Sequence, residues 1–419
     1  MSEAPALPDA DVETLPALAE IAEWLERTAL RGVPSGDLVA GLGERLAAAG
    51  IPLTRMTAMV DTLHPVHEGS VYRWVAGEEG ATTFTYDRDY DESRWQETAY
   101  YHLDRHNLPA YRERLQPGRE PDLASLRDFR DDGYRDYLVV VERFEDSGSV
   151  GEMTCIYASW MTRAPEGFSE AAVATLRRLS PVLALALKCL ELHDISLTVA
   201  QTYLGRNAAA RVMQGSILRG RASEIDAVLW SSDLMSFTAH AEALEPAELI
   251  PFLNAYSGAL VAAIEGAGGD VLKFMGDGLL AIFPVDGDPA LACRAALAAE
   301  RAARRLVGLV NDKRAESGRR TTDFYLALHL GRVYFGNIGS AERLDFTVIG
   351  PAVNEATRIM ALCSSVRRPL LLSARFAETL SGPNLFGGIT PAGEDLPLAS
   401  VGRFALKGVT EAQHLYTLA

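Results

Sequence analysis

The order of apolar segments after Arg221 constrains the fold more than any other feature of the sequence. Apolar spacing predicts a strand over 226–232, a helix over 246–265, two strands over 270–284, and an alanine-rich helix over about 289–316. Two further strands flank Gly331, another ends at Gly350, a helix covers 351–363, and the last strands lie near 368–372, 400–406 and 413–418. Segments with one apolar face each must bury those faces against one another.

Strands and helices in this order predict an α+β domain over residues 221–419. The expected architecture is a mixed sheet with helices on one side, which is the ferredoxin-like arrangement. A chain of 419 residues exceeds one typical core, so a further domain is expected before it.

The front of the chain has a different pattern. Residues 1–11 are acidic and contain proline, and they are expected to be disordered. Helical spacing follows from Val12 to Arg31, and strands are predicted over 54–63, 71–86, 137–143 and 151–161, before a helix that begins near Glu170. This mixture predicts an α+β sensor domain over 12–181 that is similar to a GAF domain.

Residues 182–220 are predicted to be a helical linker. Apolar residues recur at threes and fours in this segment, at Leu185, Cys189, Leu192, Ile195, Val199 and Tyr203. Such a stripe suits packing on the sensor's own sheet or a parallel two-helix seam in a dimer, and the seam is favoured. Gly205 and Gly215 then provide a flexible joint into the second domain.

Composition excludes several classes of partner. The formal net charge is −16, which argues against nucleic acid and anionic membranes as partners. The four cysteines lack metal-ligand spacing, and the N-terminus lacks the features of a secretion signal. No apolar run is expected to reach the roughly 18 residues that span a bilayer. A cytoplasmic location without a membrane span is therefore predicted.

Three polar groups interrupt the apolar segments of the second domain. Asp233 ends a buried strand and precedes Phe237 and Thr238, so its carboxylate could hold a metal while nearby backbone N–H groups face phosphates. A turn or a helix cap is the ordinary alternative for such an aspartate.

The second polar group is Lys273 with Asp277. Gly276 and Asp277 suit a tight hairpin turn, but this does not explain a lysine within an otherwise apolar strand. The run 268–270, Gly-Gly-Asp, is reminiscent of a diguanylate cyclase, but the acidic and aromatic residues that should follow it are absent, so a loop is expected.

The third polar group follows the strand that contains Thr347. Asn354 and Arg358 are four residues apart on a predicted helix, so their side chains lie on one face. A solvated helix face would be the preferred explanation for an isolated pair of this kind.

Together, the three groups resemble the class III adenylyl cyclase family over about residues 205–419. The resemblance implies metal-binding carboxylates at Asp233 and Asp277, purine selection by Lys273 and Thr347, ribose orientation by Asn354, and transition-state stabilisation by Arg358. It also implies phosphate contacts for Arg332 and Lys407. Two departures from the family pattern are Ser236, where a glycine is usual, and Thr347, where many relatives have aspartate. Lysine with threonine resembles the IIIb subgroup.

The resemblance implies conversion of ATP to 3′,5′-cyclic AMP and pyrophosphate with two Mg²⁺ or Mn²⁺ ions per site. In this family one protomer supplies the carboxylates and the other the purine, ribose and arginine contacts, so a homodimer with two interfacial sites is implied. The rival interpretations are a guanylyl cyclase and a degenerate domain that binds nucleotide without catalysis.

The sensor half contains four of the five tryptophans and two histidine pairs. The aromatic residues could line a pocket for an unidentified small-molecule signal or could be ordinary core residues. His64 with His67, and His102 with His106, have spacings seen in metal and haem sites, but no cysteine lies near either pair in the sequence.

Overall fold

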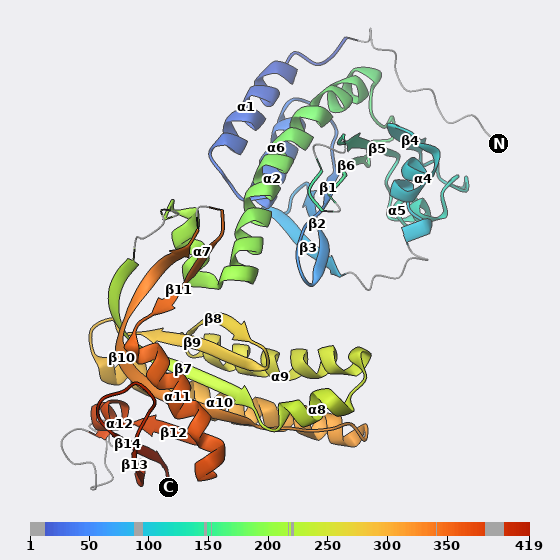
Figure 1. Cartoon of the computed structure of the whole chain (residues 1–419). Coiled ribbons are helices and arrows are strands. Elements are labelled where there is room, and N and C mark those ends of the chain that lie inside the picture. The colour runs from blue at the N-terminus through green and yellow to red at the C-terminus, as the bar shows by residue number, and fades with distance from the viewer. Residues whose placement is uncertain are drawn as a thin grey trace. The chain divides into compact units, whose positions relative to one another are not determined.

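The fold is seen in a computed structural model that describes residues 13–87, 95–145, 149–151, 153–216, 218, 222–340, 342–381 and 398–419 (Figure 1). The predicted disorder of residues 1–11 lies outside these residues. The chain divides into two compact units, Met1–Val199 and Ala200–Ala419. Each unit is α+β, and each is described by itself.

The first unit is built on a six-stranded antiparallel sheet in the order β3-β2-β1-β6-β5-β4. Its strands are β1 (Arg55–Asp61), β2 (His67–Val75), β3 (Ala81–Asp87), β4 (Ala110–Arg114), β5 (Asp136–Arg143) and β6 (Cys155–Thr162). The strand predicted over 71–86 is therefore wrong, because a turn at 76–80 divides it into β2 and β3.

Alternate residues of each strand point to opposite faces of this sheet. Both faces carry apolar residues, and helices cover both. Met56, Ala58 and Val60 face a core shared with α1 (Leu18–Leu30), α2 (Ser35–Ala48) and α6 (Glu170–Leu204). Met59 and Tyr157 face a second core with α4 (Ala99–His106) and the short segments η1 (Ala124–Leu126) and α5 (Arg127–Asp131) nearby.

The second unit contains the predicted ferredoxin-like core. In chain order this core is β7 (Ala222–Leu234), α9 (Pro246–Gly266), β8 (Asp270–Met275), β9 (Gly278–Pro284), α10 (Pro289–Glu316) and β10 (Phe324–Gly339). The sheet order β10-β7-β9-β8, with every neighbouring pair antiparallel, confirms that arrangement. The two strands expected on either side of Gly331 are one continuous strand, β10.

Further elements extend this core. β12 (Leu370–Ser373) pairs parallel with β10, and β14 (Gln413–Leu418) and β13 (Leu398–Phe404) follow outward, so the sheet is mixed as predicted. β11 (Leu344–Ile349) pairs with the end of β10. The remaining helices are α7 (Arg206–Met213), α8 (Phe237–Ala243), α11 (Pro351–Val366) and α12 (Ala374–Ser381).

The helices lie on both faces of the second sheet, so the prediction of one helical side is wrong. Val228 and Trp230 of β7 pack with α9, α10 and α12, whereas Ala227 and Leu229 face α7, α11 and β11. The prediction holds for the two crossover helices of the ferredoxin-like core, and α11 adds a layer on the opposite face. This second layer carries part of the candidate site.

The expected stripe on α6 divides between two environments. Ile195 is buried, and Leu192 and Val199 pack partly against the core of the first unit. Leu185 and Tyr203 are 67% and 81% exposed, and Cys189 is also exposed. The sheet-packing alternative is thus the better description of the middle of the stripe.

One helix among the described residues could cross a membrane by length and composition, namely α9. The expectation that no apolar run would do so overlooked it. Core helices meet the same criteria, and Phe252, Tyr256 and Ile264 of α9 pack against the second unit's sheet.

Candidate active site

Asp233 lies where β7 leaves the sheet. The strand is buried from Ala227 to Ser232, and Asp233 is the first residue after this run that solvent reaches. Ser236 then takes a left-handed backbone conformation with φ of 55°, and α8 begins at Phe237. Ser236 therefore keeps the conformation that a glycine would adopt without strain. Phe237 is half-buried and Thr238 is exposed.

Asp277 lies beside Asp233 because β9 is the neighbour of β7. The hairpin between β8 and β9 turns at Gly276, which has φ of 69°, and Asp277 lies immediately before β9. Burial, a hydrogen bond with Asp277 and the charge of Asp277 raise the pKa of Asp233 to about 7. The two carboxyl groups are thus close enough to compete for one proton.

The space around this pair is restricted by Gly278. A Cβ atom at this position would lie 3.0 Å from the Ser232 carbonyl oxygen and 3.2 Å from Asp233 Oδ1. Two adjacent hard oxygen ligands without a nearby lysine or arginine partner among their described contacts fit a divalent cation. Within the described part of the chain, no group of three His, Cys, Asp or Glu side chains could hold a metal ion.

Lys273 contacts β11, the strand that contains Thr347, and β11 packs on the sheet face that contains Leu272 and Leu280. Lys273 Nζ lies 3.2 Å from Asp345 Oδ2, and both side chains are partly exposed. Thr347 lies two residues after Asp345 and is 5% exposed, and its hydroxyl oxygen has no hydrogen-bond partner among the described residues. A buried hydroxyl without a partner is uncommon and is a ready polar contact for a ligand.

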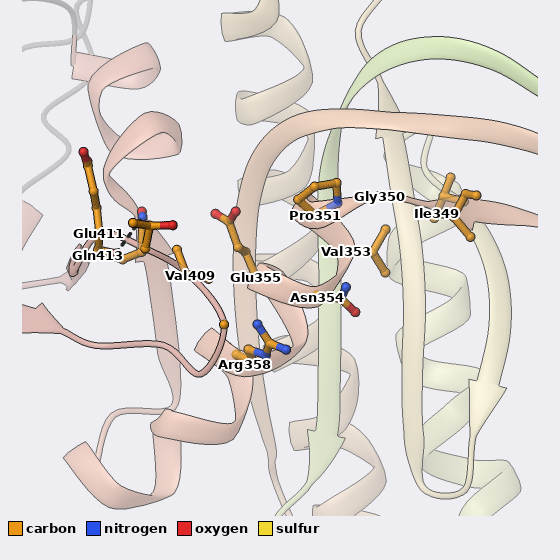
Figure 2. Close-up of a pocket in the computed structure, with 13 residues that line it drawn as sticks. Ile349, Gly350, Pro351, Val353, Asn354, Glu355, Arg358, Val409, Glu411 and Gln413 are labelled. Carbon is orange, nitrogen blue, oxygen red and sulfur yellow. Dashed lines mark hydrogen bonds between the residues drawn. The ribbon is translucent and has the colours of Figure 1, made fainter.

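Asn354 and Arg358 face a cavity of about 890 Å³ between α11 and the segment that precedes β14 (Figure 2). Pro351 starts α11 with its fixed φ, and the two side chains lie one turn apart on its open face. A Cβ atom on Gly408 would lie 3.4 Å from Arg358 Nη1, so the absence of a side chain there leaves room for the guanidinium. Lys407 is exposed next to this glycine.

Two residues near this cavity were not predicted from sequence. Glu355 lines it, and burial raises the pKa of that carboxyl group. His329 Nε2 lies 3.6 Å from Glu355 Oε2, and burial lowers the pKa of His329 to about 4. The available signal was a histidine within the apolar strand segment 326–330, the same kind of signal that singled out Lys273.

Arg332 lies apart from the carboxylates. It is 63% exposed and contacts Glu224 at 2.7 Å, and its register partner on β7 is Asp226. The register partner of Asp233 is Tyr325, seven residues earlier on β10. Within one chain the structure therefore does not bring Arg332 to Asp233.

The histidine pairs of the first unit have other neighbours. The rings of His64 and His67 stack at 4.7 Å, and His67 Nδ1 lies 2.7 Å from Asp87 Oδ1. His102 and His106 also lie 4.7 Å apart, and His102 contacts the ring of Tyr111 edge-on. Neither pair belongs to a group of three potential metal ligands among the described residues.

The contacts described for the predicted residues fall into three groups within one chain. Asp233 with Asp277 is the first, Lys273 with the β11 segment the second, and Asn354 with Arg358 the third. The residues that line the α11 cavity do not include Asp233, Asp277 or Lys273. A single chain therefore does not gather all six central side chains in this cavity.

Part of the chain is similar to proteins of known activity. It is 33% identical over 171 residues to an adenylate cyclase of Anabaena cylindrica, covering 40% of this chain and 33% of that protein. It is 28% identical over 190 residues to the terminal-differentiation specific adenylate cyclase of Dictyostelium discoideum, covering 45% of this chain and 8% of that protein. The chain thus spans a third or less of these curated relatives. No protein-family model matches it.

Solved structures give weaker likenesses. The adenylyl cyclase CyaB from P. aeruginosa is 22% identical with a TM-score of 0.42, covering 48% of this chain and 96% of that one. A bacterial light-regulated adenylyl cyclase is 21% identical with a TM-score of 0.45, covering 57% of this chain and 64% of that one. The fold given above depends on strand order and not on these likenesses.

Proposed function

We propose that this chain is an adenylate cyclase that converts ATP to 3′,5′-cyclic AMP and pyrophosphate. The observation that carries the proposal is the adjacency of Asp233 and Asp277 at the ends of neighbouring strands, in a chain whose sequence is similar to curated adenylate cyclases. The Asn354–Arg358 cavity would supply polar contacts to the ribose and the phosphates.

Asp233 and Asp277 would hold Mg²⁺ or Mn²⁺, two ions per site. When bound there, the ions would supply positive charge to the triphosphate and the attacking hydroxyl. Among the described residues only Asp233 and Asp277 converge here, so substrate oxygens would complete the coordination. The raised pKa of Asp233 supports this role, because two crowded carboxylates are stabilised by a cation between them.

Asn354 and Arg358 would bind the reacting part of ATP. The planar guanidinium of Arg358 can donate two hydrogen bonds to the α-phosphate as negative charge develops on it. The Asn354 amide can hold the ribose so that its 3′ oxygen is in line with the α-phosphorus. Both side chains are placed one turn apart on a packed helix, which fixes their spacing. Lys407, beside Gly408, is the proposed additional phosphate contact, and Arg332 a weaker one.

Lys273 and Thr347 would select adenine. The Lys273 ammonium can donate to adenine N1, and the Thr347 hydroxyl can accept from the amino group, whereas guanine presents the opposite pattern. The unpartnered hydroxyl of Thr347 supports this assignment. The pair corresponds to the IIIb-like interpretation of the sequence.

The active form would be a homodimer with sites at the interface. The α11 cavity is lined by Asn354 and Arg358 but by neither Asp233 nor Asp277, which supports shared sites with the carboxylates of one protomer facing Asn354 and Arg358 of its partner. Large apolar side chains beside the groups are exposed: Phe274 at 57%, Met275 at 42% and Ile349 at 47%. Exposed apolar clusters are typical of surfaces that pack against another protein.

The first unit would be a GAF-like sensor that regulates the cyclase. A six-stranded antiparallel sheet with helices on both faces supports the GAF-like assignment. A cytoplasmic location is proposed with it, since all four cysteines are free, including the exposed Cys189.

The direct test is turnover by the full-length chain with ATP or GTP and with Mg²⁺ or Mn²⁺, followed by chromatography of the products. We expect cyclic AMP from ATP and far less cyclic GMP from GTP. Asp277→Asn should lower turnover by about 10² or more, because one metal ligand loses its charge. The exposed Asp312→Asn is the matched control and should retain activity. Nucleotide binding without any product would favour the non-catalytic alternative.

A further inference from the structure

The first unit contains a cavity of about 850 Å³ that the proposed cyclase reaction does not use. It lies on the sheet face opposite α1, α2 and α6, where strands β1, β2, β3 and β6 face α4. This volume falls in the range of pockets that hold small organic molecules. The question is which chemical class of ligand the wall would accept.

Aromatic rings form much of the wall. Trp95 stacks on Tyr100 with ring centroids 6.1 Å apart, and Tyr157 meets both rings edge-on at 6.1 Å and 5.1 Å. Tyr86 adds a further ring to the lining. The negative faces of such rings attract cations, most strongly where water is excluded.

The charged lining residues are mostly acidic. Asp61, Glu68 and Asp104 contribute carboxylates, and Asp61 and Asp104 accept hydrogen bonds from the hydroxyls of Tyr86 and Tyr157. Burial, followed by the charge of Asp61, raises the pKa of Tyr86 far above its ordinary value. The phenols therefore stay neutral and orient the carboxylates.

Arg143 is the one lysine or arginine among the described residues of the lining, and three of its five N–H donors are already used. Its guanidinium contacts Asp104 Oδ1 at 3.0 Å and donates to the carbonyl oxygens of Leu103 and Leu108 at 3.1 Å and 2.9 Å. An anionic ligand that used these three donors would have to break their contacts, and it would also meet the carboxylate of Glu68. The wall therefore disfavours phosphates and carboxylates.

We propose that this cavity binds a small organic cation, an amine or quaternary ammonium with an aromatic or apolar body. The ammonium group lies against the rings of Trp95 and Tyr157 within reach of the acidic side chains, and the apolar body fills the space beside Met59 and Val71. This inference is independent of the proposed cyclase activity, because it concerns binding to the first unit alone.

The test compares three probes of similar size and different charge by calorimetry with the full-length chain: 2-phenylethylamine, 2-phenylethanol and phenylacetate. We expect the amine to bind, the alcohol to bind about tenfold or more weakly, and phenylacetate not to bind at all. Quenching of tryptophan fluorescence gives a second readout, since Trp95 is in the wall.

Two isosteric variants locate the binding. Glu68→Gln removes a carboxylate from the lining without changing its shape, and should weaken binding of the amine several-fold. Glu79→Gln, in the exposed turn between β2 and β3, makes the same change in net charge outside the cavity and should leave binding unchanged. The proposal is overturned if the amine does not bind, if the alcohol or phenylacetate binds equally well, or if both variants have the same effect.

Discussion

Two features of its surroundings disfavour the charged form of Asp233 in the metal-free protein. It lies at the end of a buried strand, and it shares its surroundings with a second carboxyl group. Both burial and Asp277 favour the protonated form, and the pKa of Asp233 rises to about 7 from an unfolded value near 4. The folded state therefore binds a proton more tightly than the unfolded state between about pH 4 and pH 7.

This difference predicts a pH-dependent gain in stability for Asp233→Asn in the absence of metal. As pH rises through this window, the folded chain must give up its proton at a cost, so the free energy of unfolding falls. The amide variant avoids that cost, and in EDTA its melting temperature should exceed that of the native chain at pH 8 but not near pH 4. Thermal unfolding followed by circular dichroism measures this.

Asp312→Asn serves as the control for that comparison, because Asp312 is exposed on α10. Addition of Mn²⁺ at pH 8 should raise the melting temperature of the native chain and leave that of Asp233→Asn nearly unchanged. Equal melting curves for the native chain and Asp233→Asn at every pH would contradict the explanation.

The sequence indicated the key side chains better than their neighbours. Strand order alone places Asp233 beside Asp277, and helical spacing alone places Asn354 beside Arg358. The ion pair of Lys273 with Asp345 depends instead on β11 crossing the sheet face, a tertiary feature that no local pattern encodes. The same holds for His329 and Glu355, which come from different elements.

At the scale of single elements, α6 is held to its unit by a buried carboxyl group. Glu191 is 3% exposed, and its Oε1 accepts hydrogen bonds from Ser35 Oγ at 2.7 Å and from the Tyr72 hydroxyl at 2.6 Å. One side chain thus links α6 to α2 and β2. Burial raises the pKa of Glu191, so its charged form is the costly one.

Two substitutions at this position should have opposite effects on stability. Glu191→Gln keeps an acceptor for both hydroxyls and removes the buried charge, so the free energy of unfolding at pH 7 should be unchanged or higher. Glu191→Leu leaves two buried hydroxyls without an acceptor and should cost about 2 kcal/mol or more.

Urea unfolding followed by tryptophan fluorescence measures both variants, because four of the five tryptophans belong to this unit. A loss of stability in Glu191→Gln as large as that in Glu191→Leu would show that the charge, and not the acceptor, matters.

Element prediction failed where tertiary packing overrides local preference. The sequence analysis assigned no helix to α2, which contains Gly41 and Gly43. A Cβ atom at these positions would lie 2.8 Å from Trp24 and 2.4 Å from Trp74, so the glycines allow two indole rings to pack against the helix. Glycine lowers helix propensity, and only the packed structure reveals why it is present.

At the scale of the whole molecule, the ferredoxin-like core was predictable because its order of elements permits few topologies. The layer that α11 forms on the opposite face was not predictable, because the apolar residues of α11 could pack against either face of the sheet. The cavity with Asn354 and Arg358 belongs to the α11 layer, and its lining does not include Asp233 or Asp277. This arrangement is the basis for expecting catalysis between two chains.

Shared sites predict complementation between inactive variants. Asp277→Ala and Arg358→Ala should each be inactive alone, but a mixed dimer has one site with both native residues. Random pairing makes half of the dimers mixed, so about a quarter of native activity should return. Co-expression with two affinity tags, followed by a cyclic AMP assay, measures the recovery. Tandem-purified mixed dimers without activity would contradict the shared-site arrangement.

β10 joins the parts of the second unit that must act together. This strand of 16 residues has Tyr325 opposite Asp233, Gly331 against Ala352 of α11, and Tyr334 opposite Ile349 at the cavity. One residue gained or lost within it would turn every later side chain to the other face and slide one polar group past another. Insertions and deletions among related proteins are therefore expected in the loops at the ends of β10. The length of the strand itself is expected to stay constant, because it sets the spacing between these polar groups.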